Sequence, residues 1–313
     1  MFVVCGEALM DVYANGSTLT GMALDARIGG SPLNVAIGLS RMQQPVCFFS
    51  AVSRDFLGDR LMQAIEQEGV GTVTVTRSES PTTLSMVGLD AKGVPSYAFH
   101  GDHGADRQLP ASSLASLPAH IAAVHFGSYA TVVEPVASTL RVLVERVQGR
   151  ALIAYDPNVR LNVEPDIARW QAHVEWMMPR TTLLKISDED LGLISPGETP
   201  DAFAARAIAQ GVSLVVVTCG GRGSLGFTAQ TQAQAAQVPV AVVDTVGAGD
   251  TFQSGLLTWL AEGARLDAAA LRALSADQLH DALQFAGTAA SIVCGRRGAD
   301  MPRRNELPAR RPG

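Results

Sequence analysis

The sequence predicts an α/β fold with a central, mostly parallel sheet flanked by helices and a small extra β-sheet. Three observations support this prediction. Short apolar runs recur along the chain, longer Ala-rich amphipathic stretches lie between them, and two segments rich in Thr, Ser, Gly, Val and Tyr interrupt the alternation. Alternating buried strands and helices are typical of a parallel sheet that is covered on both faces.

The regular elements follow from this apolar spacing. Buried strands are expected at 2–4, 46–52, 124–126, 152–155, 183–186 and 214–218. Helices are expected over 56–68, 134–147, 200–210, 251–262 and 275–294. A chain of 313 residues suggests about two domains by length, but large α/β folds reach this size as one unit, so we expect a single domain over 1–313.

The interrupting segments, 12–28 and 81–103, are expected to form short antiparallel strands with turns, such as one at 90–93, and to extend from the main sheet as a β-flap. Residues 229–237, rich in Gln and Ala, are expected to form a surface loop or hairpin. The stretch from residue 301 onward is rich in Pro and Arg and is expected to be a frayed tail.

Composition excludes several classes of protein. The chain is 47% hydrophobic and 17% charged, with a formal net charge of −6. A nucleic-acid partner needs a clustered basic surface, and the Arg pairs at 296–297, 303–304 and 310–311 are better explained as a solvated tail. No apolar run approaches about 18 residues and the N-terminus does not resemble a secretory signal. We therefore expect no membrane span and a cytoplasmic protein.

The four cysteines indicate no disulfide framework or metal site. They are Cys5, Cys47, Cys219 and Cys294, and none forms a Cys-x-x-Cys pair. They lie in or next to apolar runs, so reduced thiols in or near the core are expected.

The strongest chemical signal is the segment 242–252, Val-Val-Asp-Thr-Val-Gly-Ala-Gly-Asp-Thr-Phe. Small residues at this junction let backbone amides approach an anion, and the helix that follows adds a partial positive charge. Such an arrangement suits the oxygens of a transferring phosphoryl group. Asp250, at the head of the helix, is either an ordinary N-terminal cap or a general base for a substrate hydroxyl. If it is the base, its carboxylate should face a cavity.

Two further segments carry polar groups near strand or helix ends. At 29–39, two glycines and a serine precede Pro32, which suits a first helical turn, and Asn34 lies one turn inside. At 154–160, Arg160 follows a buried strand, where ligands of α/β sheets bind. A tight turn before a capped helix explains the first segment equally well, and a surface turn explains the second.

Together these segments resemble the ribokinase-like carbohydrate kinases, the PfkB family. The resemblance spans nearly the whole chain, from Gly6-Glu7-Ala8-Leu9-Met10-Asp11 to Arg297-Gly298-Ala299, with both glycine segments in the family's order. Within the family the chain is most similar to fructokinases, because of the Gly6–Leu9 opening and the segments at 125–128, 156–160 and 185–187. The resemblance implies a ribokinase-like fold in which the β-flap, 12–28 and 81–103, is a lid over the sugar.

The resemblance also implies roles on the sugar side. Asp11 would contact sugar hydroxyls, and the substrate pocket would be lined by Gly29, Gly30, Asn34, Tyr97 and Phe99. Arg160 would reach the sugar or the phosphate passing to it. Asp250 would be the base, with the amides of Gly247, Ala248 and Gly249 as the anion hole.

ATP, Mg²⁺ and K⁺ are the implied nucleotide and ions. The nucleotide side would include Lys185, Ser187, Thr218, Gly220, Gly223, Gly247 and Gly249. Mg²⁺ would be held through water by Asp190 or Glu189, where the family has a longer Glu in place of Asp190. The carbonyls of Asp244 and Val246, with Gly298 as a weaker candidate, would hold the monovalent cation.

The expected activity is ATP-dependent phosphorylation of a primary hydroxyl of a sugar, fructose first. Alternatives left open are a kinase of ribose, 2-keto-3-deoxygluconate or a riboside, and a non-catalytic sugar-sensing module. The expected partners are the sugar and ATP, with no nucleic acid and no membrane. A homodimer through the lid is a further expectation from the resemblance.

Overall fold

The central strands are runs of aliphatic and β-branched residues because both of their faces are buried. The computed structural model describes residues 1–89 and 95–309. In spatial order, the main sheet contains β13 (Gln232–Ala235), β12 (Ser224–Phe227), β11 (Leu214–Thr218), β10 (Leu183–Ser187), β9 (Leu152–Asp156), β8 (Ala123–Gly127), β1 (Phe2–Cys5), β4 (Val46–Ser53) and β5 (Val75–Ser78). Strands β11 to β5 pair in parallel, and β12 and β13 extend one edge in antiparallel fashion. Their parallel carboxyl ends therefore meet at one edge of the sheet.

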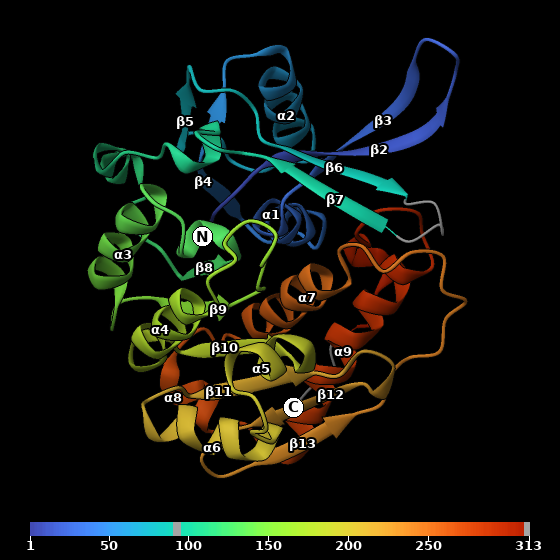
Figure 1. Ribbon diagram of the computed structural model, residues 1–313. Helices are drawn as coiled ribbons and strands as arrows, with labels where there is room; N and C mark the ends of the chain where they lie inside the picture. The colour runs from blue at the N-terminus through green and yellow to red at the C-terminus, as the bar shows by residue number, and fades with distance from the viewer. Residues whose placement is uncertain (90–94, 310–313) are drawn as a thin grey trace.

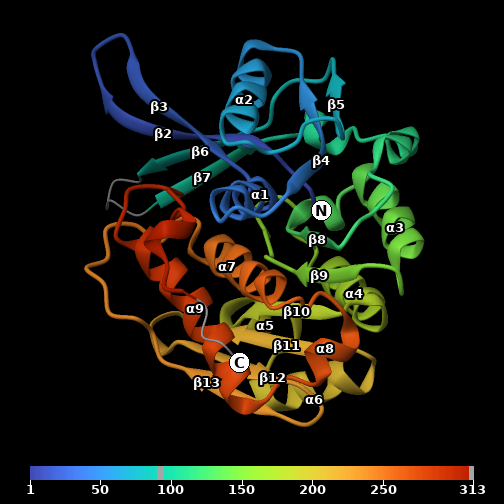
Figure 2. The ribbon, with the colours of Figure 1, turned by 180° about the vertical axis from the view of Figure 1, so that it is seen from behind.

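Two helical layers cover this sheet (Figures 1 and 2). One layer contains α1 (Ser31–Arg41), α2 (Phe56–Gln67), α7 (Ala248–Glu262), α8 (Ala268–Arg272) and α9 (Ala276–Cys294). The other contains α3 (Val136–Val147), α4 (Ile167–Met177), α5 (Asp188–Ile194) and α6 (Pro200–Ala209). Strand β1 shows how the layers are separated: Phe2 and Val4 pack in the first core, and Val3 and Cys5 pack in the second.

The smaller sheet projects to one side of the molecule (Figure 1). Its spatial order is β3 (Met22–Gly29), β2 (Leu9–Ser17), β6 (Leu84–Leu89) and β7 (Pro95–His100). The two hairpins, β2–β3 and β6–β7, are antiparallel as expected, but the two middle strands, β2 and β6, pair in parallel. The predicted turn at 90–93 lies outside the described residues.

Most predicted elements are present, and the differences are informative. Residues 232–235 form an edge strand of the hairpin that was expected as one alternative for 229–237. Helices α4, α5 and α8 and strands β5 and β12 were not predicted. Residues 301–309 are not frayed, because Met301 is fully buried and the Arg304 guanidinium donates to Glu262. The predictions of a frayed and solvated tail were therefore wrong for this stretch.

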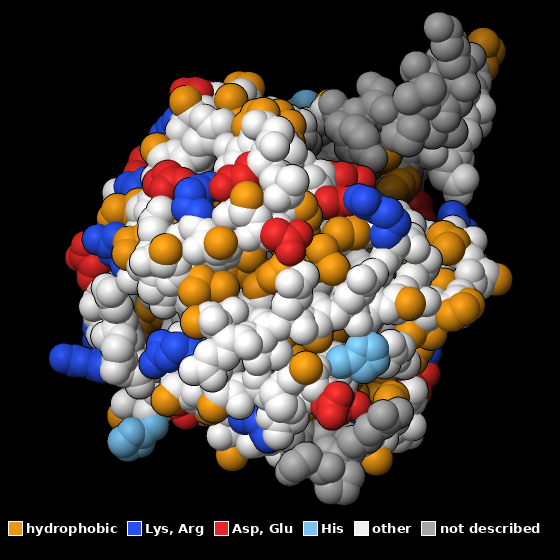
Figure 3. Space-filling model, turned by 90° about the horizontal axis from the view of Figure 1, so that it is seen from below, with side chains coloured by type: hydrophobic (Ala, Val, Ile, Leu, Met, Phe, Trp, Pro, Cys, Tyr) orange, Lys and Arg blue, Asp and Glu red, His pale blue; other side chains and the backbone are white. Residues whose placement is uncertain are grey.

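The surface and the thiols agree with the composition. Cys5, Cys47 and Cys219 are buried, Cys294 is half-buried, and all four are free, so the thiols lie in or near the core, where they were expected. On the face seen in Figure 3, acidic and basic side chains are interspersed among apolar ones. Within residues 1–89 and 95–309, no helix has the length and apolar character needed to cross a membrane.

Candidate active site

The opening of α7 is formed by a tight, left-handed turn. Gly247 is the N-cap residue with φ of 77°, and a Cβ there would lie 2.8 Å from the Ala299 Cβ. Both the dihedral and the close approach explain why this position is glycine. The Ala248 amide donates to the Thr245 carbonyl at 3.2 Å. This amide, one of the three expected to form the anion hole, therefore already has a hydrogen-bond partner within the turn. The amide of Gly249 belongs to the first helical turn, where the helix offers no carbonyl partner.

The carboxylate of Asp250 is where two segments distant in sequence meet. Ser31 Oγ donates to Oδ1 at 2.6 Å and Asn34 Nδ2 donates to Oδ2 at 2.8 Å. Burial raises the pKa of Asp250, and these two hydrogen bonds oppose that rise. The carboxylate is not simply a helix cap, because α7 has no side-chain cap bond. The prediction that the carboxylate faces a cavity is not met, because Asp250 is 7% exposed and its oxygens lie against Ser31 and Asn34.

Two of the three α-helices in the described part of the chain that start without a side-chain cap meet at this site. Helices α2, α4, α5, α6, α8 and α9 begin with a side chain that caps a backbone amide. Helices α1 and α7, which face each other at Asp250, have no such cap, and α3 also lacks one. Uncapped amides at a helix start are ready donors for an anion or ligand.

Gly29 and Gly30, in the segment expected on the sugar side, lie close to the chain that leaves β1 and enters β2. A Cβ at Gly30, where φ is 110°, would lie 2.5 Å from the Glu7 carbonyl oxygen, and one at Gly29 would lie 2.2 Å from Asp11 Oδ2. Asp11 is half-buried on β2. Burial raises its pKa, a hydrogen bond with Ser85 lowers it, and Asp250 is close enough to raise it further.

Arg160 supplies positive charge to the same region from the loop after β9. Its side chain is exposed and donates to the Val159 carbonyl at 3.0 Å. Burial raises the pKa of Asp11, Asp190 and Asp250, and the charge of Arg160 opposes the rise at each. The structure thus brings together six residues that the resemblance assigns to the sugar side: Asp11, Gly29, Gly30, Asn34, Arg160 and Asp250.

A buried ion pair lies next to the α7 opening. Lys185 Nζ, on β10, contacts Asp156 Oδ2, on β9, at 2.6 Å, with side chains 5% and 4% exposed. The same Nζ lies 3.1 Å from the position that a Cβ at Gly249 would occupy. Lys185, expected on the nucleotide side, therefore places its charge directly beside the first turn of α7.

The acidic candidates for the metal lie beside this pair, at the start of α5. Ser187 caps the helix by accepting from the Asp190 amide at 3.0 Å. Burial, and then the charge of Asp156, raise the pKa of Asp190 to about 6, and its Oδ1 accepts from the Val159 amide at 3.3 Å. Glu189 is exposed. Asp190, with the carboxylate of Asp156 beside it, offers oxygen donors suited to a hydrated cation.

The remaining residues expected on the nucleotide side, Thr218, Gly220 and Gly223, lie farther along the same edge of the sheet. Thr218 ends β11, and the turn after it is closed by the Cys219 amide donating to the Gly223 carbonyl at 2.8 Å. Gly220 is exposed there and Gly223 is half-buried. Strand β10, which carries Lys185, lies between β11 and β9. An elongated ligand along the strand ends would be needed to span these places.

The side chain of Asp244 is engaged by its own loop. Its Oδ1 accepts from the Val246 amide at 3.1 Å and its Oδ2 accepts from the Gly298 amide at 2.9 Å. The three residues proposed for a monovalent cation are thus brought together by Asp244, whose carboxylate ties the loop before α7 to the chain after α9.

The base of the smaller sheet is a buried cluster that the sequence did not predict. Phe99, expected to face the ligand, packs edge-on against Tyr129 at 5.4 Å and lies under the Arg107 guanidinium at 5.6 Å. Asp106 is buried and accepts from Thr83 and from the Tyr129 hydroxyl. Tyr97 lies on β7 opposite Val87. The ring of Phe99 therefore packs the smaller sheet against the main body.

Three polar residues at the site were also missed as individual candidates: Ser31, Asp156 and Asn158. Asn158 donates to Ser31 Oγ, which in turn donates to Asp250. The available signal was position, because each lies within a segment already selected: Ser31 begins α1, Asp156 ends β9, and Asn158 lies two residues after that strand.

The chain is similar to known carbohydrate kinases. The family model described as "pfkB family carbohydrate kinase" matches residues 1–305. A fructokinase of Rhizobium leguminosarum bv. trifolii is 33% identical over 260 residues, which cover 83% of this chain and 79% of the relative.

Solved structures show the same fold. A fructokinase of Xylella fastidiosa with bound ATP superposes with a TM-score of 0.86 at 24% identity, covering 97% of this chain and 96% of that one. A fructokinase of Vibrio cholerae O395, in a form with fructose, ADP and calcium ion bound, gives a TM-score of 0.78 at 26% identity, covering 95% and 94%. The chain belongs to the pfkB family of carbohydrate kinases.

Proposed function

We propose that this chain transfers the γ-phosphoryl group of ATP to a primary hydroxyl of fructose, with Asp250 as the general base. The observation that carries the proposal is the convergence of Ser31 and Asn34, from the sugar-side helix α1, on the carboxylate at the start of α7. Fructose is chosen because the relatives described above are named fructokinases.

Ser31 indicates where the substrate alcohol binds. A hydroxyl that donates to Asp250 Oδ1 at 2.6 Å has the geometry a general base requires of the alcohol it deprotonates. The sugar hydroxyl takes the place of Ser31 Oγ on Oδ1, while Asn34 stays on Oδ2 and keeps the carboxylate oriented. Asp11 and Gly29–Gly30 line the sugar, and Arg160 reaches toward the group being transferred.

The phosphoryl group lies against the opening of α7. Amides of the first turn, with Gly249 among them, and the partial positive charge of the helix start stabilise its oxygens. Lys185 adds a full positive charge beside Gly249. The rest of ATP extends along the strand ends toward Thr218, Gly220 and Gly223.

Two cations complete the proposal. Asp190, through water, holds Mg²⁺, which supplies charge neutralisation on the phosphates when it is bound. A monovalent cation, K⁺, is held at carbonyls of the loop at 244–246. The single-domain organisation over 1–313, the cytoplasmic location, the homodimer through the lid and the absence of nucleic-acid and membrane partners stay predictions.

The base assignment is tested with Asp250→Asn. The exchange keeps the shape and both hydrogen-bond donors nearby but removes the proton acceptor, so kcat for fructose should fall by about a hundredfold or more. Binding of a non-hydrolysable ATP analogue, measured as a thermal shift, should be retained. Thr258→Val, a fully buried position on the same helix, is the matched control and should keep near-normal kcat.

Near-normal turnover by the Asn variant would refute the role of Asp250. The substrate is tested separately, by comparing the wild-type kcat/KM for fructose, ribose, 2-keto-3-deoxygluconate and a riboside. A higher kcat/KM for any of the others would replace fructose in the proposal and leave the base untouched. If the wild-type chain consumes no ATP with any of these four substrates, the result would favour a sugar-sensing module.

A further inference from the structure

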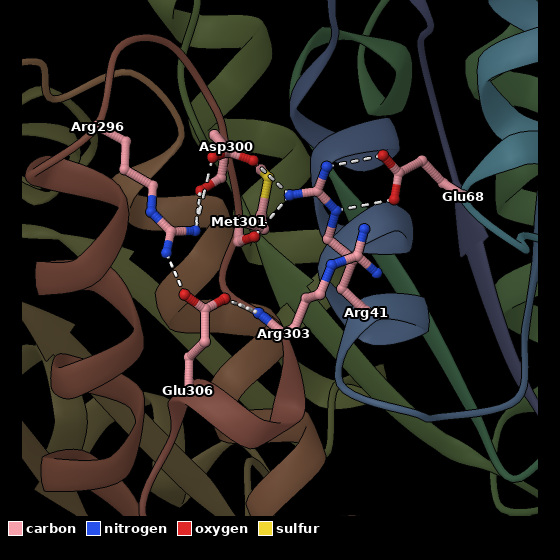
Figure 4. Close-up of polar contacts among 7 residues, drawn as sticks. All are labelled: Arg41, Glu68, Arg296, Asp300, Met301, Arg303 and Glu306. Carbon is pink, nitrogen blue, oxygen red and sulfur yellow. Dashed lines mark hydrogen bonds and ion pairs between the residues drawn. The ribbon is translucent and has the colours of Figure 1, made fainter.

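Arg41, the last residue of α1, joins three parts of the chain (Figure 4). Its Nε and Nη2 donate to the two carboxylate oxygens of Glu68 at 2.8 and 2.7 Å. Its Nη1 donates to Asp300 Oδ1 and to the Met301 carbonyl, both at 2.6 Å. The Arg41 side chain is 16% exposed, so these bonds form in a largely desolvated place where a planar fork of donors is well suited.

Residues 295–301, which we call the strap, follow α9 and pass from Arg41 to the turn before α7. The Gly298 amide donates to Asp244 at 2.9 Å. Ala299 Cβ lies 2.8 Å, and Met301 Cε 3.4 Å, from the position of a Cβ at Gly247. Because Gly247 has no side chain, the strap is the surface against which its left-handed turn rests.

Polar contacts, more than packing, hold the strap at its middle. Met301 is fully buried, whereas Gly295, Arg297 and Asp300 are exposed. A cavity of about 200 Å³ has Ala299 in its wall and lies between α1, α2 and β3. With open space on one side, the position of Ala299 depends on the polar contacts of the residues on either side of it. Asp244 accepts from the Gly298 amide, in the middle of the strap. Asp300 is held by Arg41 and also by Arg296, which donates to the Asp300 carbonyl at 3.2 Å.

We propose that Arg41 is a positioning residue for phosphoryl transfer: it fixes the strap against Gly247, and the strap orients the first-turn amides of α7 and Asp250. This inference rests on the role proposed above for that turn. Displacements of about 1 Å at a reacting centre can cost about a hundredfold in rate. Arg41 acts through the strap and the turn at Gly247, so we expect its removal to lower kcat by nearer tenfold.

The test compares three variants of the full chain. Arg41→Met removes all four donated bonds. Glu68→Gln weakens the link between α1 and α2 but leaves Asp300 and Met301 bound to Arg41. Arg304→Met is the matched control, because Arg304 also holds a glutamate, Glu262, with side chains 19% and 25% exposed, against 16% and 23% for Arg41 and Glu68.

The expected result is a kcat about tenfold lower in R41M, with KM for the sugar changed less than threefold. R304M should lose a comparable amount of stability to urea and keep its kcat, and E68Q should keep most of its kcat. Arg41→Lys, which can reach one acceptor, should recover part of the loss. Wild-type kcat in R41M, or an equal loss in E68Q or R304M, would overturn the inference.

If R41M does not fold, Asp300→Asn decides, because Asp300 is 53% exposed and its exchange should leave the fold intact. A kcat two- to threefold below wild type supports the strap, and an unchanged kcat overturns it. Failure of the proposed function gives a different pattern: the wild-type chain itself would then fail to phosphorylate the sugars, or D250N would remain active.

Discussion

Removal of Lys185 should destabilise the protein strongly, because it would leave Asp156 charged and unpaired in the interior. The two side chains are 5% and 4% exposed, their charged atoms are 2.6 Å apart, and Asp156 Oδ1 has no hydrogen-bond partner within the described part of the chain. Breaking a buried pair by removing one partner typically costs about 3–5 kcal/mol. We expect Lys185→Met to lose about that much free energy of unfolding at pH 7.

The double variant separates the pair from the packing. Lys185→Met with Asp156→Leu removes both charges and fills similar space, so most of the lost stability should return, since apolar replacement of a buried pair is often neutral or better. Arg54→Met is the matched control for an exposed pair, because Arg54 and Glu79 are 57% and 87% exposed. It should change stability by less than about 0.5 kcal/mol.

Urea unfolding supplies the measurement, with the midpoint and the slope fitted separately so that a change in the unfolded state is detected. A loss below about 1 kcal/mol in the single variant would contradict the account, because the uncompensated charge would then cost much less than a buried pair implies. A double variant as unstable as the single one would show that packing of the lysine stem, and not its charge, supplies the stability.

Two further predictions concern Glu7 and Gly247. Glu7 is 2% exposed, and burial raises its pKa from 4.5 to about 8. As the pH rises, the carboxyl therefore loses its proton in the unfolded chain before it does so in the folded protein. The free energy of unfolding should consequently fall between about pH 4.5 and 8, by up to ~1.4 kcal/mol per pH unit. Glu7→Gln should flatten this part of the urea-midpoint profile, and an unchanged slope would show that Glu7 is not its source. Gly247→Ala should lower kcat more than tenfold, because φ is 77° and Ala299 lies 2.8 Å from the new Cβ. Gly149→Ala has a similar φ of 73° with nothing within 4 Å and should lose stability but not kcat; an equal kcat loss in both would assign the effect to backbone strain.

The sequence predicts the main sheet well because its strands are continuous apolar runs, from Phe2–Cys5 to Leu214–Thr218. Helices α4 and α5 were missed for two different reasons. Helix α5 covers only Asp188–Ile194 and begins with three acidic residues, which conceal its apolar face. In α4 the large aromatic side chains Trp170 and Trp176 differ in burial, so its helical period is weak in the sequence.

At the site, the segments were predictable but their contacts were not. Asp250 and Asn34 belong to motifs that stand out locally, whereas the bond between them joins α1 to α7 and arises only when both helices pack on one face of the sheet. The burial of Asp250 against Ser31 is likewise a tertiary result. The contacts of Arg41 had no local signal in the sequence. Its partners are Glu68 at the C-terminal cap of α2, Asp300, and Met301, the first residue of the stretch expected to be frayed.

The parallel pairing of β2 with β6 bears on the order in which the chain can fold. No tight turn can connect two parallel neighbours, and α1, β4, α2 and β5 all lie between them in the chain. Either hairpin alone would be marginally stable in water. We therefore expect the smaller sheet to be completed late, after β1 and β4 have paired and brought β2 and β6 side by side. A nascent chain that ends before β7 lacks one of the four strands of this sheet.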